Sequence, residues 1–295
     1  MRKIDFLYLG GDKCGSTWIY SILKSHPDVC LPVAKELFFF DRFYDKGWDW
    51  YLAQFPRACE ASRIGEICHD YLYSDLALRR ISRDLGNQAR YLICLREPME
   101  RAVSHYRHML KIGRTNLSFE AALDAFPEII DHSLYAHKVE RAFELLGQTN
   151  VKVLFFDSLR EDPVSFGEQL SNALDIGFDP SLPYEHRVLE GGNARSPAVV
   201  KVLRDLGWMI RGLGLPGLVG AVKENALITR LLYSGRTSRS RVVDALGKDA
   251  AQALSAKFSS DIVALEELLG VSLPAWHLAL GDGRSERVAK TSVVP

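Results

Sequence analysis

The beginning of the chain constrains its fold more than any other segment. An apolar run at residues 4–9 leads into a glycine-rich stretch, GGDKCGSTW, from Gly10 to Trp18, and a helical pattern follows. This order predicts a strand, a phosphate-sized loop and the start of a helix. Successive backbone N–H groups at such a turn, the positive end of the following helix and Lys13 together form a site for a phosphate or sulfate group. The sequence therefore indicates an anionic cofactor.

The loop differs from that of nucleotide triphosphatases in the position of its lysine. The triphosphatase pattern G-x-x-x-x-G-K-[ST] places lysine directly after the second glycine. Gly10 and Gly15 have that separation, but Ser16 stands in the lysine's place and Lys13 comes two residues before Gly15. This order resembles the 5′-phosphosulfate loop of sulfotransferases that use 3′-phosphoadenosine 5′-phosphosulfate (PAPS). An ordinary strand-to-helix turn is the alternative for this segment alone. The resemblance implies that the residues in contact with PAPS are Lys13, Cys14, Gly15, Ser16, Thr17 and Trp18.

A second segment indicates another anion site. Residues 89–95 have the pattern of a buried strand, and Arg96 opens the turn into a helix predicted over 99–110. The order L-R-x-P-x-x-R-x-x-S-x-Y resembles the 3′-phosphate-binding segment of the same sulfotransferases, whose arginine and serine fall on Arg96 and Ser104. A guanidinium can hold a phosphate bidentately, and a hydroxyl two helical turns on can complete the cage. Two such segments, each at the carboxyl end of a strand, favour a cofactor site over a surface arginine on a solvated helix.

The third segment carries the candidate chemistry. Lys35 and Glu36 stand directly before an aromatic run, and the stretch continues through Tyr-Asp-Lys-Gly to Tyr51. It resembles the Lys-Glu-x-x-Phe-Phe-Asp stretch of heparan sulfate sulfotransferases, in which the glutamate is the catalytic base. The resemblance implies that role for Glu36. The alternative is an exposed pair of charges beside a core strand.

A second candidate base follows. Residues 65–72, GEICHDYL, resemble the next segment of the heparan sulfate enzymes. Those enzymes have a lysine where this chain has Ile67, so the contacts that their lysine makes with the acceptor cannot be assigned to this chain. His69 is the alternate base, as a histidine is in the cytosolic sulfotransferases; a surface or hydrogen-bonding role is the other interpretation. Imidazole has an unperturbed pKa near ~6.5, whereas a glutamate must be shifted or assisted by a cation to act at neutral pH.

Two later segments complete the predicted cofactor site. Tyr135 occupies a place where the family often has a tyrosine near the nucleotide, and a core aromatic is the alternative. The order from Tyr233 to Thr237 resembles the Gly-Arg-Thr loop with which the family closes over the 3′-phosphate. The resemblance implies cofactor contacts from Gly235 and Arg236, whereas an exposed basic turn would have the same composition.

Composition favours an enzyme with a local anion site. The chain has 295 residues, 47% of them hydrophobic, and its 37 basic and 37 acidic residues give zero net charge. No global field therefore draws it to nucleic acid or to a membrane. The cysteines are odd in number and lack zinc spacing, which favours free thiols in a reducing compartment. Because the glycine loop comes so early, no cleavable signal can be drawn, and a cytoplasmic location is expected.

Alternating strand and helix patterns predict an α/β fold with a central, mainly parallel sheet flanked by helices, and the resemblance implies a P-loop-like, three-layer form of it. We expect one sulfotransferase domain over residues 1–282 and a flexible tail at 283–295. Residues 206–240 are expected to form a lid or an acceptor-side wall. Their apolar part, 206–222, is too short and too broken for a membrane span, which needs about 20 apolar residues. A buried contact or an oligomer contact, and a weak contact with a membrane or lipid acceptor, are the alternatives.

The resemblance implies a PAPS-dependent sulfotransferase of bacterial type. Such an enzyme transfers the sulfuryl group in line to a hydroxyl, or an amine, of a carbohydrate, glycosylated or small-molecule acceptor and releases adenosine 3′,5′-bisphosphate. Glu36 would take the acceptor's proton and Lys13 would neutralise the leaving oxygen, with no metal. A P-loop-type small-molecule kinase would need Mg²⁺ and a lysine after Gly15. A nucleotide-binding module without catalysis would keep the cage and lack the base, and a membrane-associated structural protein would rest on 206–222 alone.

Overall fold

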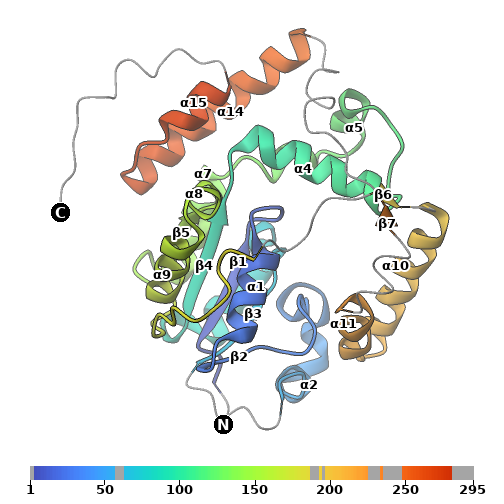
Figure 1. The fold of residues 1–295 in the computed structure, drawn as a ribbon, viewed down its shortest axis with the longest axis vertical. Coiled ribbons are helices and arrows are strands. Elements are labelled where there is room, and N and C mark those ends of the chain that lie inside the picture. The colour runs from blue at the N-terminus through green and yellow to red at the C-terminus, as the bar shows by residue number, and fades with distance from the viewer. Residues whose placement is uncertain are drawn as a thin grey trace.

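The centre of the fold is a parallel sheet. A computed structural model describes residues 3–56, 63–186, 193–194, 197–224, 233–234 and 248–280. Five strands pair in the order β2-β3-β1-β4-β5, and every neighbouring pair is parallel. The predicted α/β fold with a mainly parallel sheet is therefore confirmed (Figure 1). The strands are β1 (Phe6–Gly10), β2 (Val29–Cys30), β3 (Arg63–Ile67), β4 (Arg90–Leu95) and β5 (Val151–Phe155).

Helices connect successive strands and cover the sheet. Two short strands, β6 (Asn193–Ala194) and β7 (Tyr233–Ser234), form a separate antiparallel pair. The helix predicted over 99–110 is α4, which begins at Pro98 and ends at Lys111. The remaining helices are α1 (Ser16–Ser25), α2 (Gly47–Leu52), α3 (Asp75–Asp84), α5 (Phe119–Ala125), α6 (Glu128–Asp131), α7 (Ala136–Leu146), α8 (Phe156–Glu161), α9 (Pro163–Ala173), α10 (Pro197–Gly212), α11 (Pro216–Glu224), α14 (Lys248–Leu269) and α15 (Pro274–Ala279).

Strand β1 explains why the sheet is covered on both faces. Successive side chains of a strand point to opposite faces. Phe6 and Tyr8 pack in a core with residues of α1 and α9, whereas Leu7 and Leu9 pack in a second core with residues of α3, α7 and α14. All four side chains are fully buried. A strand that is apolar at every position needs apolar cover on both sides, and the three layers provide it.

The first part of the predicted 206–240 insertion is helical. It comprises the end of α10 and the whole of α11, which lie beside α2 and away from α14 and α15 (Figure 1). Within the described ranges, no helix has the length and apolar character needed to cross a bilayer. Residues 225–232 and 235–240 of the predicted insertion, and the predicted tail at 283–295, lie outside the described residues.

The expectation of free thiols is wrong at one position. Cys14, Cys68 and Cys94 are free and buried, but Cys30 is disulfide-bonded. Spacing in the sequence could not show this, because the fold and not the chain order decides which cysteines meet. Disulfides are typical of oxidising compartments. The argument from free thiols for a cytoplasmic location therefore loses force, and that location stays a prediction.

Candidate active site

The candidate site lies at the carboxyl ends of four adjacent strands. The loop of Lys13 follows β1, His69 follows β3 and Arg96 follows β4. Glu36 lies in the segment after β2, and its backbone N–H donates to the carbonyl of Ile67 at 3.0 Å. Neighbouring parallel strands end at the same edge of a sheet, which is where ligands bind in open α/β folds. The three segments singled out in the sequence therefore meet in space.

Lys35 links the phosphate loop to the candidate base. Its ammonium group donates to Ser16 Oγ at 3.0 Å, to Thr17 Oγ1 at 3.4 Å and to Glu36 Oε1 at 3.0 Å. Helix α1 begins at Ser16, directly after Gly15, whose φ of 91° lies in the left-handed region that glycine favours. The first N–H groups of α1 thus lie at the loop beside a lysine, and this combination binds phosphate or sulfate groups.

Lys13 is partly withdrawn from water within this loop. Burial lowers the pKa of Lys13 to about 8, while Asp12 opposes the shift and Lys35 adds to it. A bound anion would favour the charged ammonium. Burial also raises the pKa of the Cys14 thiol to about 12. A thiol with this pKa is protonated at neutral pH, which argues against Cys14 as a nucleophile.

The two candidate bases lie next to each other. His69 Nδ1 is 3.0 Å from Glu36 Oε1, and His69 Nε2 is 3.2 Å from Asp70 Oδ1. Burial opposes the charged imidazole, but Glu36 and Asp70 outweigh it and raise the pKa of His69 above its ordinary value. Lys35 and His69 thus both contact Oε1 of Glu36, each at 3.0 Å.

A buried carboxylate holds the Glu36 loop in place. Glu66, in β3, accepts hydrogen bonds from the N–H of Leu37 at 2.9 Å and from the hydroxyls of Tyr51 at 2.8 Å and Tyr71 at 3.0 Å. Glu66 is fully buried, and burial raises its pKa to about 7 although the three donors oppose the shift. The loop needs this support because Glu36 has a φ of 65°, which is unfavourable for a residue other than glycine.

Arg96 connects the two predicted anion-binding segments. Its guanidinium donates to the carbonyl of Lys13 at 3.3 Å and pairs with Glu100 Oε2 at 2.9 Å. It also lies 4.7 Å from the ring centroid of Phe156. Ser104 lies about two turns along α4 and is half-buried. Arg96 is therefore held beside the loop, and a phosphate that binds it would share it with Glu100.

Tyr135 lies behind Arg96. Its hydroxyl donates to the backbone carbonyl of Arg96 at 2.7 Å, and its side chain is fully buried. This contact positions the arginine, whereas a direct contact with a nucleotide stays a prediction. The other two predicted cofactor residues of the later segments, Gly235 and Arg236, lie outside the described residues.

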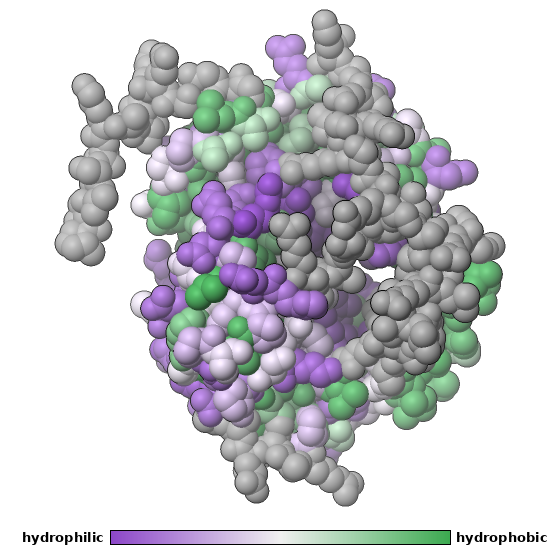
Figure 2. Space-filling model, in the orientation of Figure 1, coloured by the Kyte–Doolittle hydropathy of each residue, from purple (hydrophilic) through white to green (hydrophobic). Residues whose placement is uncertain are grey.

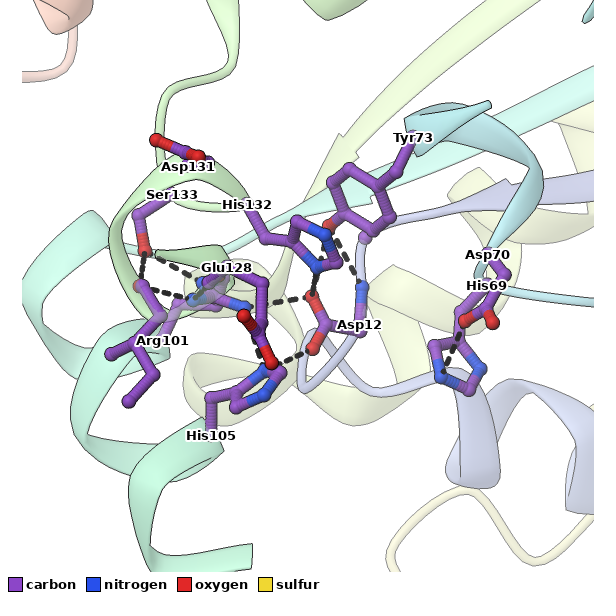
Figure 3. A network of polar contacts seen from close by, with 12 residues as sticks. Asp12, His69, Asp70, Tyr73, Arg101, His105, Glu128, Asp131, His132 and Ser133 are labelled. Carbon is purple, nitrogen blue, oxygen red and sulfur yellow. Dashed lines mark hydrogen bonds and ion pairs between the residues drawn. The ribbon is translucent and has the colours of Figure 1, made fainter. Parts of the chain in front are cut away.

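Asp12 is the centre of a buried polar network next to Lys13 (Figure 3). Its Oδ1 accepts from Arg101 Nη1 at 2.7 Å and from the Tyr73 hydroxyl at 2.9 Å, and its Oδ2 is 2.6 Å from His105 Nδ1. The His132 ring stacks on Tyr73 with centroids 3.6 Å apart. Burial alone would raise the pKa of Asp12, but Arg101 and the two histidines hold it well below its usual range. The network thus holds Asp12, and with it the glycine-rich loop after β1, in a fixed position.

Three members of this network have side chains of the types that bind metal ions. Ligand atoms of Asp12, His105 and His132 lie within 4.8 Å of one another. However, Asp12 already forms an ion pair with the guanidinium of Arg101, which is fully buried. A metal ion at this cluster would lie close to that buried guanidinium, and the repulsion between the two cations is costly. We therefore assign the cluster a supporting role for the loop.

Comparison with known proteins decides the family. A family profile described as a sulfotransferase domain matches residues 3–185, more than half of the chain. The chain belongs to the sulfotransferase family. A solved structure, a sulfotransferase from Alicyclobacillus acidocaldarius, matches this sulfotransferase with a TM-score of 0.66 and 22% identity, and the match covers 94% of this chain and 100% of that one. At that identity the likeness shows a shared fold.

Curated relatives of this sulfotransferase match it over shorter stretches. Heparan sulfate glucosamine 3-O-sulfotransferase 3B1 from Homo sapiens is 34% identical over 104 residues, which are 35% of this chain and 26% of that protein. Membrane-associated sulfotransferase kil1 from Dictyostelium discoideum is 26% identical over 143 residues, which are 45% of this chain and 30% of that protein. The chain thus spans less than a third of the length of these relatives.

Sequence reasoning missed three features of this sulfotransferase's site. It did not give Lys35 a contact with the loop, Glu66 a role in holding the Glu36 segment, or Asp12 a network. Glu66 could have been noticed, because a carboxylate inside an apolar strand is unusual and buried acids are almost always partnered. The contacts of Lys35 and Asp12 depend on strand order, which the sequence does not state directly.

Proposed function

We propose that this sulfotransferase transfers the sulfuryl group of PAPS to a hydroxyl, or an amine, of a carbohydrate, glycosylated or small-molecule acceptor. The observation that carries the proposal is the position of Lys35, which contacts both the phosphate loop through Ser16 and the candidate base Glu36. Donor site and base are then close enough for in-line transfer. The family's use of PAPS as sulfuryl donor supports this choice.

The described residues fit the anionic groups of the proposed donor. The 5′-phosphosulfate would lie on the backbone from Lys13 to Trp18, at the start of α1, and the 3′-phosphate would bind Arg96 and Ser104. The hydrogen bond from Arg96 to the Lys13 carbonyl, at 3.3 Å, supports a single site that holds both ends of one nucleotide.

The chemistry requires one base and one cation at the leaving oxygen. As the acceptor oxygen bonds to sulfur, Glu36 takes its proton, and His69 and Lys35 orient the carboxylate. The bond between sulfur and the 5′-phosphate oxygen breaks, and its electron pair stays on that oxygen. The Lys13 ammonium neutralises this charge. As in phosphoryl transfer, positioning and electrostatics supply most of the rate enhancement.

The acceptor class rests on relatives. A protein named for heparan sulfate glucosamine is 34% identical over 104 residues, and the stretch from Lys35 to Tyr51 carries much of the resemblance. We infer a sugar hydroxyl as the first acceptor to test. We further propose that transfer requires no metal ion, so that activity survives dialysis against a chelator.

Isothermal titration tests the donor site directly. The purified chain should bind adenosine 3′,5′-bisphosphate tightly, and adenosine 5′-monophosphate should bind far more weakly because it lacks the 3′-phosphate. Arg96→Ala should lose about 2 to 3 kcal/mol of binding free energy, the scale of a charge-assisted pair. Preference for ATP with Mg²⁺, or no binding at all, would overturn the proposal.

A further inference from the structure

The α10–α11 hairpin borders the candidate active site. Arg211 Nη1 donates to the carbonyl of Glu36 at 2.5 Å, and the Trp208 ring lies on Phe38 with centroids 5.0 Å apart. A methyl group added to Gly220 would come within 3.0 Å of the Val33 carbonyl, so α11 packs closely on the segment that leads to Lys35. The inner face of the hairpin thus packs against the Glu36 loop.

The outer face of the same hairpin is apolar and exposed. Nine of the sixteen large hydrophobic side chains that are exposed among the described residues lie between Val199 and Leu218. On α10 they recur every three or four residues. Figure 2 shows hydrophobic surface along the outer edge of this hairpin. Leu213, in the turn, is 71% exposed. Scattered apolar side chains are ordinary on a surface, but a continuous stripe marks an interaction site.

The apolar face continues to the active site. Val33, two residues before Lys35, is 49% exposed and adjoins α11. Trp208 is partly exposed and contacts Phe38, which follows Glu36 by two residues. A molecule lying on this face could therefore present one end to Glu36 without leaving apolar surface.

Charge favours an anionic partner. The hairpin, residues 197–224, contains four lysines and arginines against two acidic residues, whereas the whole chain has zero net charge. An apolar stripe in a basic segment is typical of elements that rest on anionic lipid. A second copy of the chain is disfavoured, because a two-fold contact through this face would bring two basic segments together.

We propose that the α10–α11 hairpin rests on an anionic lipid surface and that the acceptor is an amphiphile whose polar head group reaches Glu36 from that surface. This inference rests on the proposed sulfuryl transfer and names the substrate class for it. Arg211 is buried and holds the hairpin against the backbone carbonyl of Glu36, so a head group at the inner end of the apolar face would lie next to the Glu36 loop.

Vesicle flotation of the full chain tests the surface. We expect the wild-type chain to float with vesicles of phosphatidylcholine mixed with phosphatidylglycerol and to float less with phosphatidylcholine alone. The triple substitution Leu206→Ser, Met209→Ser and Leu213→Ser should weaken binding about 100-fold, because each side chain contributes roughly 1 kcal/mol at partial burial. A matched control, Leu76→Ser, Val164→Ser and Leu278→Ser, changes exposed apolar side chains on α3, α9 and α15 and should float like wild type.

The outcomes separate this inference from the proposed function. Titration with adenosine 3′,5′-bisphosphate reports on the donor site and on folding of each variant. If the nucleotide binds but the wild-type chain does not float, or if both triple variants lose binding equally, the lipid surface is wrong and the sulfotransferase proposal stands. If light scattering shows a wild-type dimer that the hairpin variant dissociates, the face binds a second copy instead. If the single substitution Leu213→Asp leaves flotation intact, the proposal also fails.

Discussion

At the scale of single residues, Glu36 and His69 lie in direct contact. The sequence offered them as competing bases, whereas the structure puts His69 Nδ1 3.0 Å from Glu36 Oε1. Asp70 on the other side of the imidazole helps to raise the pKa of His69. A raised pKa favours the charged imidazole, and a charged imidazole cannot take the proton of an acceptor hydroxyl. This argument favours Glu36 as the base.

Glu36→Gln tests that assignment. The amide keeps the size of the side chain but cannot take a proton, so turnover should fall by about 10³-fold, within the usual range for a general base. Binding of adenosine 3′,5′-bisphosphate should remain nearly unchanged. Glu140→Gln, an exposed glutamate on α7, is the matched control and should behave as wild type.

His69→Asn separates the two roles further. If His69 only orients Glu36, we expect a turnover loss of about tenfold, smaller than that of Glu36→Gln. A larger loss in His69→Asn, together with substantial turnover in Glu36→Gln, would move the base to His69. Rates with PAPS and a sugar acceptor measure both.

Glu66 gives a prediction about stability and pH. Its pKa is about 7 in the folded chain, because burial raises it from the ordinary value of 4.5. The group therefore stabilises the fold fully below pH 4.5, and this contribution is lost as the pH rises to 7. The loss approaches about 3 kcal/mol. We expect the free energy of unfolding of wild type, minus that of Glu66→Gln, to be about 3 kcal/mol lower at pH 8 than at pH 4.5. Urea unfolding at the two pH values measures it. An equal difference between the two proteins at both pH values would contradict the shift.

At the scale of elements, the junction of β4 and α4 determines where Arg96 points. The Tyr135 hydroxyl holds the Arg96 carbonyl at 2.7 Å. Tyr135→Phe leaves that carbonyl without its donor, so we expect about tenfold weaker binding of adenosine 3′,5′-bisphosphate. Binding of adenosine 5′-monophosphate, which does not use the 3′-phosphate site, should change little. Titration calorimetry measures both affinities.

Tyr91→Phe is the matched control for that prediction. The Tyr91 hydroxyl also donates to a backbone carbonyl, that of Gly86, at 2.6 Å. Its removal should destabilise the fold by a similar amount, about 1 kcal/mol, without changing nucleotide affinity. If both variants weaken nucleotide binding equally, the effect is general destabilisation and Tyr135 has no specific role.

Elements that carry short local signals could be predicted from the sequence. The loop after β1 and the turn after β4 were identified because glycine, lysine, arginine and proline stand at strand ends in a fixed order. The roles of Glu66 and Asp12 were not identified from the sequence, because they depend on partners such as Tyr51 and Arg101 that are distant in the chain. The docking of α10 on the Glu36 loop was likewise hidden, since no local pattern encodes a contact between residues 36 and 211.

At the scale of the whole molecule, the fold class followed from alternating strands and helices, but the strand order did not. The order β2-β3-β1-β4-β5 puts the carboxyl ends of β1 and β4 side by side. Because β2, β3, β1 and β4 are consecutive in the sheet, the segments that follow these four strands form one site. The Cys30 disulfide was also out of reach, because sequence spacing does not fix which cysteines approach.

A ligand that bridges these strand ends should stabilise the entire fold. At about 100 times its dissociation constant, adenosine 3′,5′-bisphosphate adds about 2.7 kcal/mol to the free energy of unfolding. For a chain of this size the melting temperature should rise by about 5 °C or more, measured by differential scanning fluorimetry. Adenosine 5′-monophosphate at the same concentration should give a much smaller rise, and Arg96→Ala should remove the difference between the two nucleotides. An equal rise with both nucleotides in the wild-type chain would mean that the 3′-phosphate has no site at Arg96, and the four strand ends would then hold a different anion.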